Sequence, residues 1–429
     1  MGYACRMARS GHDAEWAELS GGERRLVTRT WEGDRNKAGS RADRRSYRYD
    51  AYVPVALADR EFTLRGETAA AISAAEQAVQ ELNLHPPGAI DLEALARHLL
   101  RADAVASSRI EGLVVSHRRL ARAFFVGGSE RPHDAAGAVV ANVLATERAI
   151  QLATTAERIT IETIQEIHHV LFDGTKDEGL AGIIRAQQNW IGGIASGPRD
   201  AAFIPPPQEF VIPSLEDLVV FMERRDLPTV LQAAIVHAQF ETIHPFLDGN
   251  GRVGRALIHV VLRRRGLAPS YVPPVSLVLA GWADRYVQGL TDYRFSDPES
   301  WQLVFAESVE TAAQGARAFA GRVSNLTSEW MEMAGNPRPQ SAARKLIDQL
   351  PSHPVVNLKT AQRITGMTSE AARTALNRLE RAGVLSQVSV GRRNRAYETV
   401  GLFELLDSLE RDLGPRGRTP PETTQPRAR

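Results

Sequence analysis

Twelve consecutive residues, His244 to Arg255, combine side chains that are suited to reactions of phosphate esters. They read His-Pro-Phe-Leu-Asp-Gly-Asn-Gly-Arg-Val-Gly-Arg. A histidine can take up a proton near neutral pH, and arginines form paired hydrogen bonds with phosphate oxygens. A carboxylate such as that of Asp248 is the kind of ligand that Mg²⁺ takes beside phosphate oxygens. Together, a base, a metal ligand and two arginines predict phosphoryl or nucleotidyl transfer.

The chain on either side of this stretch predicts two helices. Apolar residues recur every three to four positions, at Leu231, Ala234, Ile235 and Ala238 before it and at Val253, Leu257 and Val261 after it. Pro245 ends the first helix at His244, because the residue before a proline is disfavoured in the helical region. His244 is therefore expected to face a cleft.

The start of the second helix predicts an anion site. Gly249, Asn250 and Gly251 form a tight turn into this helix, whose first amide groups lack partners within the helix. Arg252 and Arg255 are three residues apart, so they lie on one face and both reach an anion held there. Taken singly, such a histidine is more often an ordinary polar residue and a Gly-Asn-Gly more often a plain turn. Their combination favours a functional site.

The stretch resembles the signature of the Fic (filamentation induced by cAMP) family, His-Pro-Phe-x-Asp/Glu-Gly-Asn-Gly-Arg-x-x-Arg, at every defined position. The resemblance implies an all-α enzyme with a short β-hairpin flap. Such an enzyme moves the AMP part of ATP onto a hydroxyl of a target protein and releases pyrophosphate.

The resemblance also implies a role for each residue of the stretch. His244 would deprotonate the attacking hydroxyl, and Asp248 would hold Mg²⁺. The α- and β-phosphates of ATP would lie on Gly249, Asn250, Gly251 and Arg252, and Arg255 would clamp the γ-phosphate. Phe246 would anchor the loop in the core without taking part in the chemistry.

A second informative stretch lies upstream, at Ser107-Ser-Arg-Ile-Glu111-Gly112. Ser107 and Glu111 share a helical face, and Gly112 can close a helix in the left-handed conformation, so the plain interpretation is a surface helix end. The stretch also resembles the Ser/Thr-x-x-x-Glu-Gly/Asn motif of Fic proteins with an N-terminal inhibitory helix. That resemblance implies that Glu111 pairs with Arg255 and holds the enzyme inactive, or that it orients a water for removal of AMP.

Residues 182–206 have the composition of a hairpin with a polar tip. They lie where Fic proteins keep the flap that holds the target, and Asn189, Trp190, Ile191 and Gly192 are its expected contact residues. An exposed edge there could pair with an extended target segment through main-chain bonds. A structural hairpin packed by Trp190 and Phe203 is the alternative.

The C-terminal part after Gly335-Asn-Pro-Arg-Pro resembles a winged helix-turn-helix, with helices up to 382 and a basic hairpin over 384–397. Residues 341–400 hold ten Lys and Arg against four Asp and Glu, whereas the whole chain has a net charge of +1. This local charge favours DNA binding, while protein contact remains the alternative.

Five segments are expected in 429 residues: a tail over 1–44 that is either disordered or extraneous to the working protein, an N-terminal helical segment with the inhibitory helix over 45–115, a catalytic core over 116–334, a winged helix over 335–411 and a disordered tail over 412–429. With Cys5 alone, neither an intramolecular disulfide nor a cysteine zinc site is expected. Since no long apolar run or secretory signal is evident, we expect a cytoplasmic protein without a membrane span. Monomer and homodimer both stay open.

Adjacent histidines, His168 and His169, are interpreted as core or surface residues rather than metal ligands, since no other ligand falls at suitable spacing. The leading hypothesis is a protein adenylyltransferase that uses ATP and Mg²⁺ and is restrained by Glu111. Removal of AMP, or transfer of another nucleotidyl or phosphoryl group, is the alternative within the enzymes. A DNA-binding regulator with a nucleotide-sensing core is the alternative from another class, against which His244 argues, because a sensor does not need a base.

Overall fold

Helices predominate in the computed structural model, which describes residues 15–16, 25–33, 45–84, 92–126, 134–193, 197–390 and 394–414. The part of the chain that holds the His244 loop contains α2 (Gly66–Leu84), α3 (Leu92–Ile110), α4 (His117–Val126), α5 (Ala135–Thr155), α6 (Ile161–Phe172), α7 (Val211–Met222), α8 (Thr229–Ile243), α9 (Asn250–Arg264), α10 (Val275–Gly281), α11 (Ala283–Phe295) and α12 (Pro298–Met333). None of the helices in these described ranges is long and apolar enough to span a bilayer.

The two helices predicted around the loop of His244 form the centre of the fold. Every residue of α8 is buried, as are the residues of α9 from Asn250 to Leu262. α8 packs against α9, and α5, α7 and α12 surround the pair. A helix that is covered on all sides has little freedom to shift, so the loop between α8 and α9 has a rigid frame.

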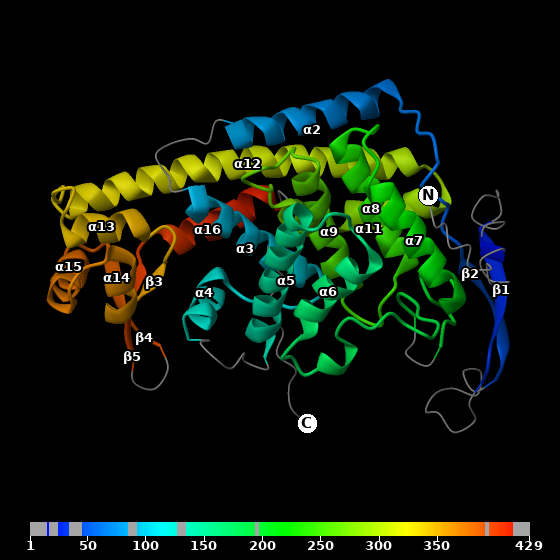
Figure 1. The fold of residues 1–429 in the computed structure, drawn as a ribbon, viewed down its shortest axis with the longest axis horizontal. Helices are drawn as coiled ribbons and strands as arrows, with labels where there is room; N and C mark the ends of the chain where they lie inside the picture. The colour runs from blue at the N-terminus through cyan, green and yellow to red at the C-terminus, as the bar shows by residue number, and fades with distance from the viewer. Residues whose placement is uncertain are drawn as a thin grey trace, which may run out of the picture.

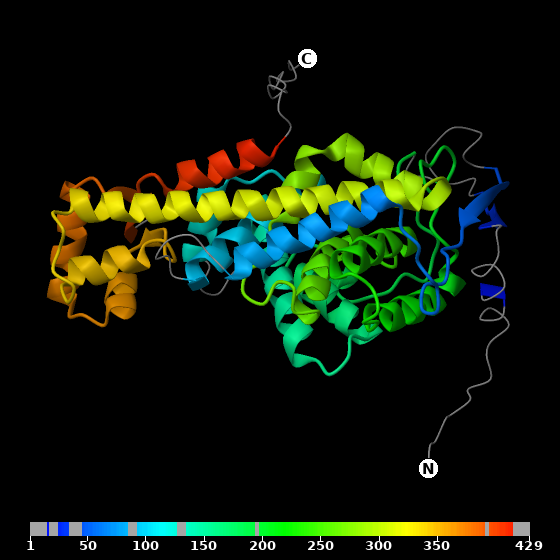
Figure 2. The ribbon, with the colours of Figure 1, turned by 90° about the horizontal axis from the view of Figure 1, so that it is seen from above.

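The longest helix, α12, connects the two ends of the molecule (Figures 1 and 2). Asp297 caps its start by accepting a hydrogen bond from the amide of Glu299, and Pro298 occupies the first turn, where a missing N–H costs nothing. Its 36 residues span about 54 Å at 1.5 Å per residue. α2 lies along one part of α12, and α16 (Leu402–Leu413) lies along another.

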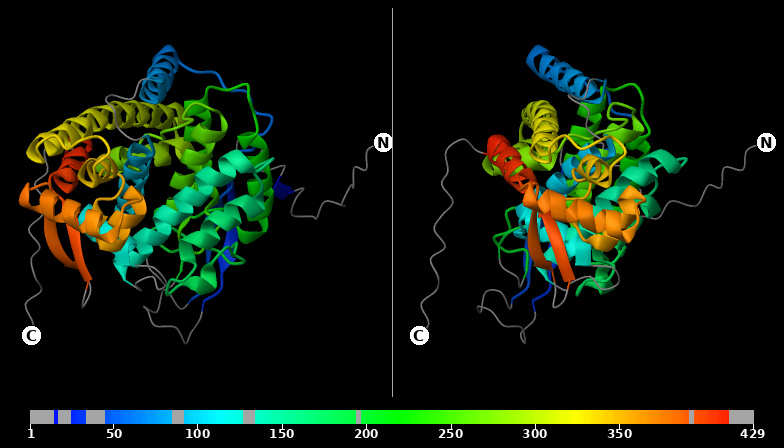
Figure 3. Two further views of the ribbon diagram at one scale, coloured as in Figure 1. Left: turned by 60° about the vertical axis from the view of Figure 1, so that its left-hand side comes forward. Right: turned by 90° about the vertical axis from the view of Figure 1, so that its left-hand side faces the viewer.

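A C-terminal unit is built from α13 (Ala342–Gln349), β3 (Val355–Val356), α14 (Leu358–Thr365), α15 (Ser369–Arg381), β4 (Leu385–Val390) and β5 (Asn394–Thr399). Its sheet has the order β3-β5-β4 with antiparallel neighbours, and Val356 and Val388 are opposite Tyr397 and Ala396 respectively. β4 and β5 project from the helices as a hairpin (Figure 3). These elements follow the predicted order, and their assignment as a winged helix stays a prediction.

The prediction of a disordered tail over 1–44 is wrong for Leu26–Trp31, which form strand β1. β1 pairs in antiparallel register with β2 (Tyr47–Tyr52), from Leu26 opposite Tyr52 to Trp31 opposite Tyr47. Val27 packs with Ala51, Val53 and Phe210 in a small separate core. The run Val-Thr-Arg-Thr-Trp has strand-forming residues but a weak apolar alternation, which explains the error. Residues 1–14, 17–24 and 34–44 of the predicted N-terminal tail, and 415–429 of the predicted C-terminal tail, lie outside the described residues.

Candidate functional site

The side chain of Asn250 fixes the conformation of the loop between α8 and α9 from within. Asn250 donates from Nδ2 to the carbonyl of Phe246 at 2.8 Å and accepts from the Phe246 amide at 2.9 Å through Oδ1. Phe246 itself is fully buried. Gly249 has φ of +79°, and a Cβ there would lie 2.7 Å from the ring of Phe172. The Asn250 side chain therefore shapes the loop, leaving backbone amide groups at the start of α9 to meet an anion.

His244 closes α8 in the left-handed conformation, with φ of 49° and ψ of 60°. Its side chain is 18% exposed, and Nδ1 lies 3.7 Å from Oε2 of Glu241. Burial, reinforced by the charges of Arg185 and Arg294, lowers the pKa of His244 to about 3. The imidazole is therefore neutral at physiological pH, which is the form that can accept a proton.

Two side chains from the predicted flap region hold the loop of His244 from outside. Asn189 donates from Nδ2 to the carbonyls of His244, at 3.1 Å, and Phe246, at 3.0 Å. Arg185 is buried and donates to the carbonyl of His244 through Nε at 2.9 Å and to that of Pro206 through Nη2 at 2.6 Å. The flap and the loop are thus one connected structure.

The rest of the predicted flap forms less regular hairpin structure than its sequence suggests. Ile191 and Phe203 form one isolated antiparallel bridge, in which the Ile191 amide donates to the Phe203 carbonyl at 2.9 Å. Trp190 packs edge-on against Trp31 of β1, with ring centroids 5.4 Å apart. Gly192 follows with φ of +72°. The tip at 194–196 lies outside the described residues.

Arg255 is buried and bonded to the end of α3. Its Nε donates to Oγ of Ser107 at 2.8 Å, and its Nη2 donates to the Ser107 carbonyl at 2.8 Å and to Oε1 of Glu111 at 2.7 Å. Gly112, with φ of +81°, ends this helix just beyond Glu111. The contact between Glu111 and Arg255 that the resemblance implies is therefore present in the structure.

The carboxylate of Glu111 lies directly over the start of α9. A Cβ on Gly251 would clash with Oε1 of Glu111 where that carboxylate now lies, so the carboxylate rests on a position that carries no side chain. Burial raises the pKa of Glu111, but the charge and hydrogen bond of Arg255 outweigh burial and lower it below its usual value. Glu111 is thus an internal anion at the helix N-terminus, where an external phosphate would otherwise bind.

Arg252 and Asp248 line the same region. Arg252 is 8% exposed, lies over the ring of Phe172 and donates to Oδ2 of Asp248 at 3.4 Å. Oδ1 of Asp248 accepts from the Gly249 amide at 2.6 Å, and the side chain is 56% exposed. Within the described ranges, no three His, Cys, Asp or Glu side chains cluster as a metal site. A lone accessible carboxylate fits Mg²⁺, which commonly takes its other ligands from phosphates and water.

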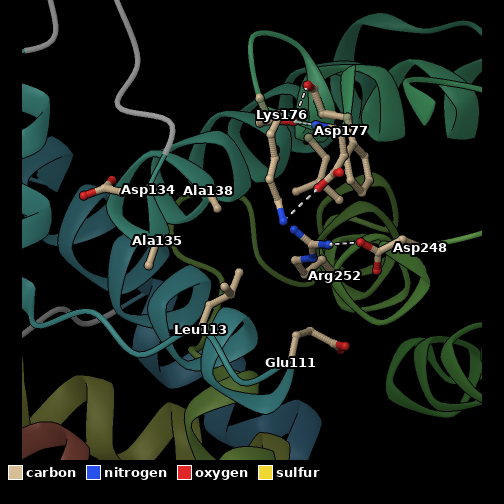
Figure 4. A pocket seen from close by; sticks show the side chains of 12 residues that line it. Glu111, Leu113, Asp134, Ala135, Ala138, Lys176, Asp177, Asp248 and Arg252 are labelled. Carbon is tan, nitrogen blue, oxygen red and sulfur yellow. Dashed lines mark hydrogen bonds and ion pairs between the residues drawn. The ribbon is translucent and has the colours of Figure 1, made fainter. Parts of the chain in front are cut away.

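A cavity of about 380 Å³ lies beside the loop, between the end of α3, the start of α5 and the end of α6 (Figure 4). Figure 4 shows Arg252 between Lys176 and Glu111, with Asp248 next to it. The volume of the cavity falls in the range of small-molecule pockets. The cavity therefore offers room for a ligand whose phosphates reach the start of α9.

Sequence reasoning missed Arg185, Glu241 and the structural part of His168. His168 accepts from the Gly182 amide through Nδ1, so its Nε2 carries the proton and donates to the Asp248 carbonyl at 3.0 Å. Its ring stacks on Phe246 at 3.8 Å, whereas His169 is exposed. The only sequence signal for the structural role of His168 is its position on the inner face of α6, with Ile164 and Leu171.

Glu241 is buried beneath His244, and burial raises the pKa of its carboxyl to about 7 against the opposing charge of Arg255. Its Oε1 has no hydrogen-bond partner among the described residues. The sequence did hold a signal for Glu241: it precedes His244 by three residues at the end of α8, and residues three apart in a helix are neighbours.

Comparisons with known proteins agree with this geometry. Residues 158–262 match the model of the Fic/DOC family, and residues 69–154 match that of the Fic/DOC family N-terminal region. The fold resembles a Fic family protein from Desulfovibrio desulfuricans, with a TM-score of 0.50 and 18% identity over 79% of this chain and 98% of that one. The two family-model matches and this fold support a Fic family protein.

Curated relatives match a shorter part. Protein adenylyltransferase fic-1 of Caenorhabditis elegans is 32% identical over 141 residues, which is 32% of this chain and 26% of that protein. A probable protein adenylyltransferase of Aquifex aeolicus is 45% identical over 69 residues, 16% of this chain and 21% of that protein. The chain thus spans about a quarter of the length of the curated relatives it matches.

Proposed function

We propose that this protein is an adenylyltransferase that transfers AMP from ATP to a hydroxyl side chain of a target protein, and to itself. The observation that carries the proposal is the convergence of a neutral His244, the open amide groups at the start of α9 and the two arginines of that helix. The names of the relatives agree with this reaction.

In the proposed reaction, the hydroxyl oxygen of the target attacks the α-phosphorus of ATP. A new bond forms between this oxygen and the α-phosphorus. The bond between the α-phosphorus and the oxygen that bridges it to the β-phosphate breaks, and pyrophosphate leaves with that oxygen. His244 takes the hydroxyl proton on Nε2, because Nδ1 is buried near Glu241. General-base catalysis of this kind contributes about 10² to 10⁴ in rate.

The phosphate chain would lie on the amides of Gly249, Asn250 and Gly251, with Arg252 beside it. Asp248 would hold Mg²⁺, which supplies charge neutralisation for the phosphates when bound. Arg255 would clamp the γ-phosphate once it is free of Glu111. The adenosine would occupy the adjoining 380 Å³ cavity.

Glu111 restrains the reaction in this proposal. Its carboxylate occupies the α9 N-terminus and binds Arg255, so ATP meets a competing internal anion. A charge-assisted hydrogen bond contributes about 1.5–3 kcal/mol, and each 1.4 kcal/mol of preference for the closed pair gives about tenfold inhibition. Residues 92–112 are accordingly assigned as the inhibitory segment.

The target would bind along the flap. Asn189 ties this segment to the carbonyl of His244, so a chain held beside Trp190, Ile191 and Gly192 would place its hydroxyl near the base.

The C-terminal unit is proposed to bind DNA. The exposed side chains of Arg373 and Arg381 on α15 support this role.

Labelled ATP tests the reaction type. Purified Glu111→Gly protein is incubated with Mg²⁺ and ATP that carries the label on either the α- or the γ-phosphorus, and the protein is then separated from nucleotide. Label from the α-phosphorus alone on the protein is the expected result. Label from the γ-phosphorus would instead indicate phosphoryl transfer and would reject the proposed reaction.

A further inference from the structure

A second cavity, of about 340 Å³, lies between the catalytic part and the C-terminal unit. Helices α3 and α4 form one wall, and α14 with the segment before β3 forms the other. Two contacts join these walls: Arg97 donates from Nη1 to the Ser352 carbonyl at 3.3 Å, and His98 hydrogen-bonds to the Pro351 carbonyl. The cavity therefore lies at a hydrogen-bonded junction between α3 and the C-terminal unit, separate from the loop of His244.

The charge of this cavity is one-sided. Arg97 and Arg101 line it from α3, and Lys359 and Arg363 line it from α14, while none of the described residues in its lining is acidic. Burial lowers the pKa of His353, which also lines the cavity, and the charges of Arg97, Arg363 and Arg101 lower it further. Like charges around one concave surface raise the local concentration of anions.

Arg101 is one cation of this set whose Nε lacks a hydrogen-bond partner among the described residues. Its guanidinium carbon lies 4.5 Å from the centroid of the Phe124 ring, and its Nε is buried. Burial and the charge of Arg97 lower the pKa of Arg101 to about 10, and only the charge of Glu147 opposes them. Glu147 lines an adjoining cavity, not this one. A buried guanidinium in this state gains most from an added anion.

The shape of the cavity favours a small ligand over a nucleic acid. A duplex presents its phosphate charges at regular intervals along an extended backbone, whereas these cations surround a recess between two walls. Phe124 and Phe125 supply apolar surface next to the cations, and the volume is that of a small-molecule pocket. We propose that this junction binds a phosphate-bearing small molecule of about mononucleotide size.

Such a ligand would bridge α3 and α14. Glu111 follows Arg101 by ten residues, which is about 15 Å along the same helical direction. The site therefore lies on the helix that carries the inhibitory segment, but its binding chemistry does not depend on the reaction proposed for His244.

The scarcity of lysine provides a direct test. The chain has four lysines, and Lys359 lines the junction cavity, Lys176 lines the cavity beside His244, and Lys345 lies on α13 outside both. The full-length protein is acetylated briefly with an amine-reactive ester, with and without AMP or inorganic pyrophosphate, and each lysine is quantified by mass spectrometry. We expect at least fivefold slower acetylation of Lys359 at saturating probe, with Lys345 unchanged.

Variants locate the effect. Arg101→Gln and Arg363→Gln are expected to raise the probe concentration for half-protection of Lys359 at least tenfold, and Arg363 is exposed, so its replacement leaves folding intact. Arg344→Gln is the matched control and should change nothing, because this arginine of α13 has a side chain that is 40% exposed and pairs with Asp348 outside the cavity. The response of Lys176 acetylation to the probes should be the same in all three variants as in wild type.

Three outcomes would overturn the proposal. The first is equal acetylation of Lys359 with and without both probes, and the second is protection that survives both Arg101→Gln and Arg363→Gln. The third is protection by a DNA duplex of matched phosphate concentration but by neither small probe, which would assign the cations to nucleic-acid binding instead.

Discussion

Two arginines near helix α3 show how differently the same side chain can be used in this protein. Arg255 makes three hydrogen bonds to Ser107 and Glu111, while Arg101 stacks on Phe124 and has an unpartnered Nε. Burial lowers the pKa of each, but the charge of Glu111 raises that of Arg255 above its usual value. The pKa of Arg101 falls to about 10.

The difference separates a closed anion site from an open one. At the start of α9 the chain provides its own carboxylate, so an external phosphate must displace Glu111 before Arg255 can bind it. At the junction with the C-terminal unit, no acidic side chain among the described lining residues is present to pair with the arginines. Changes that remove the internal anion should therefore act only at the first site, and changes that remove cations should act differently at the two.

The largest expected effect separates the two sites by catalysis. In a Glu111→Gly background, His244→Ala should reduce the rate of self-modification by about 10² to 10⁴, since a general base is lost. Arg101→Gln in the same background should leave that rate unchanged. Initial rates with α-labelled ATP provide the measurement, and an equal loss in both double variants would show that the sites are not separate.

A stability effect should follow from the buried acid beneath His244. The pKa of Glu241 is about 7 in the folded protein and 4.5 ordinarily, so the folded state holds one more proton between these values. Its contribution to stability is complete below pH 4.5 and is lost as pH rises through 7, a change of about 3 kcal/mol.

Glu241→Gln should flatten this decline in the free energy of unfolding, measured by urea titration from pH 4.5 to 7.5. Glu404→Gln is the control, because the Glu404 side chain is 62% exposed and its replacement should keep the decline. A slope that persists in Glu241→Gln would assign the titration to another group.

The smallest effect compares the two arginines directly. Arg255→Gln breaks hydrogen bonds to a buried serine and to a carboxylate that is 34% exposed, and should destabilise the fold by about 2 kcal/mol. Arg101→Gln loses a ring contact but relieves an unpaired guanidinium, so its cost should stay below about 1 kcal/mol. Urea unfolding at one pH measures both, and equal costs would contradict the distinction between closed and open sites.

Much of the catalytic loop could be predicted from sequence because its spacing is local. Pro245, the Gly-Asn-Gly turn and the apolar periodicity of α8 and α9 act within a few residues of one another, and the helices begin and end near the predicted positions. The end of α3 at Gly112 was predictable for the same reason.

Features that depend on distant partners were out of reach. Arg185 acts through carbonyls of residues more than twenty positions away, and the Asn250 side chain shapes the loop where the sequence suggested phosphate contact. β1 forms because β2 and Phe210 cover it. The junction cavity joins residue 97 to residue 363, and no local pattern records that contact.

One measurement tests the central claim, that Glu111 holds an active adenylyltransferase closed and that His244 is its base. Wild type, Glu111→Gly and Glu111→Gly/His244→Ala proteins are each incubated with Mg²⁺ and ATP, and their intact masses are compared. We predict a gain of one AMP or more on Glu111→Gly alone. The same gain on wild type would contradict the closed state, and a gain on the double variant would contradict the role of His244.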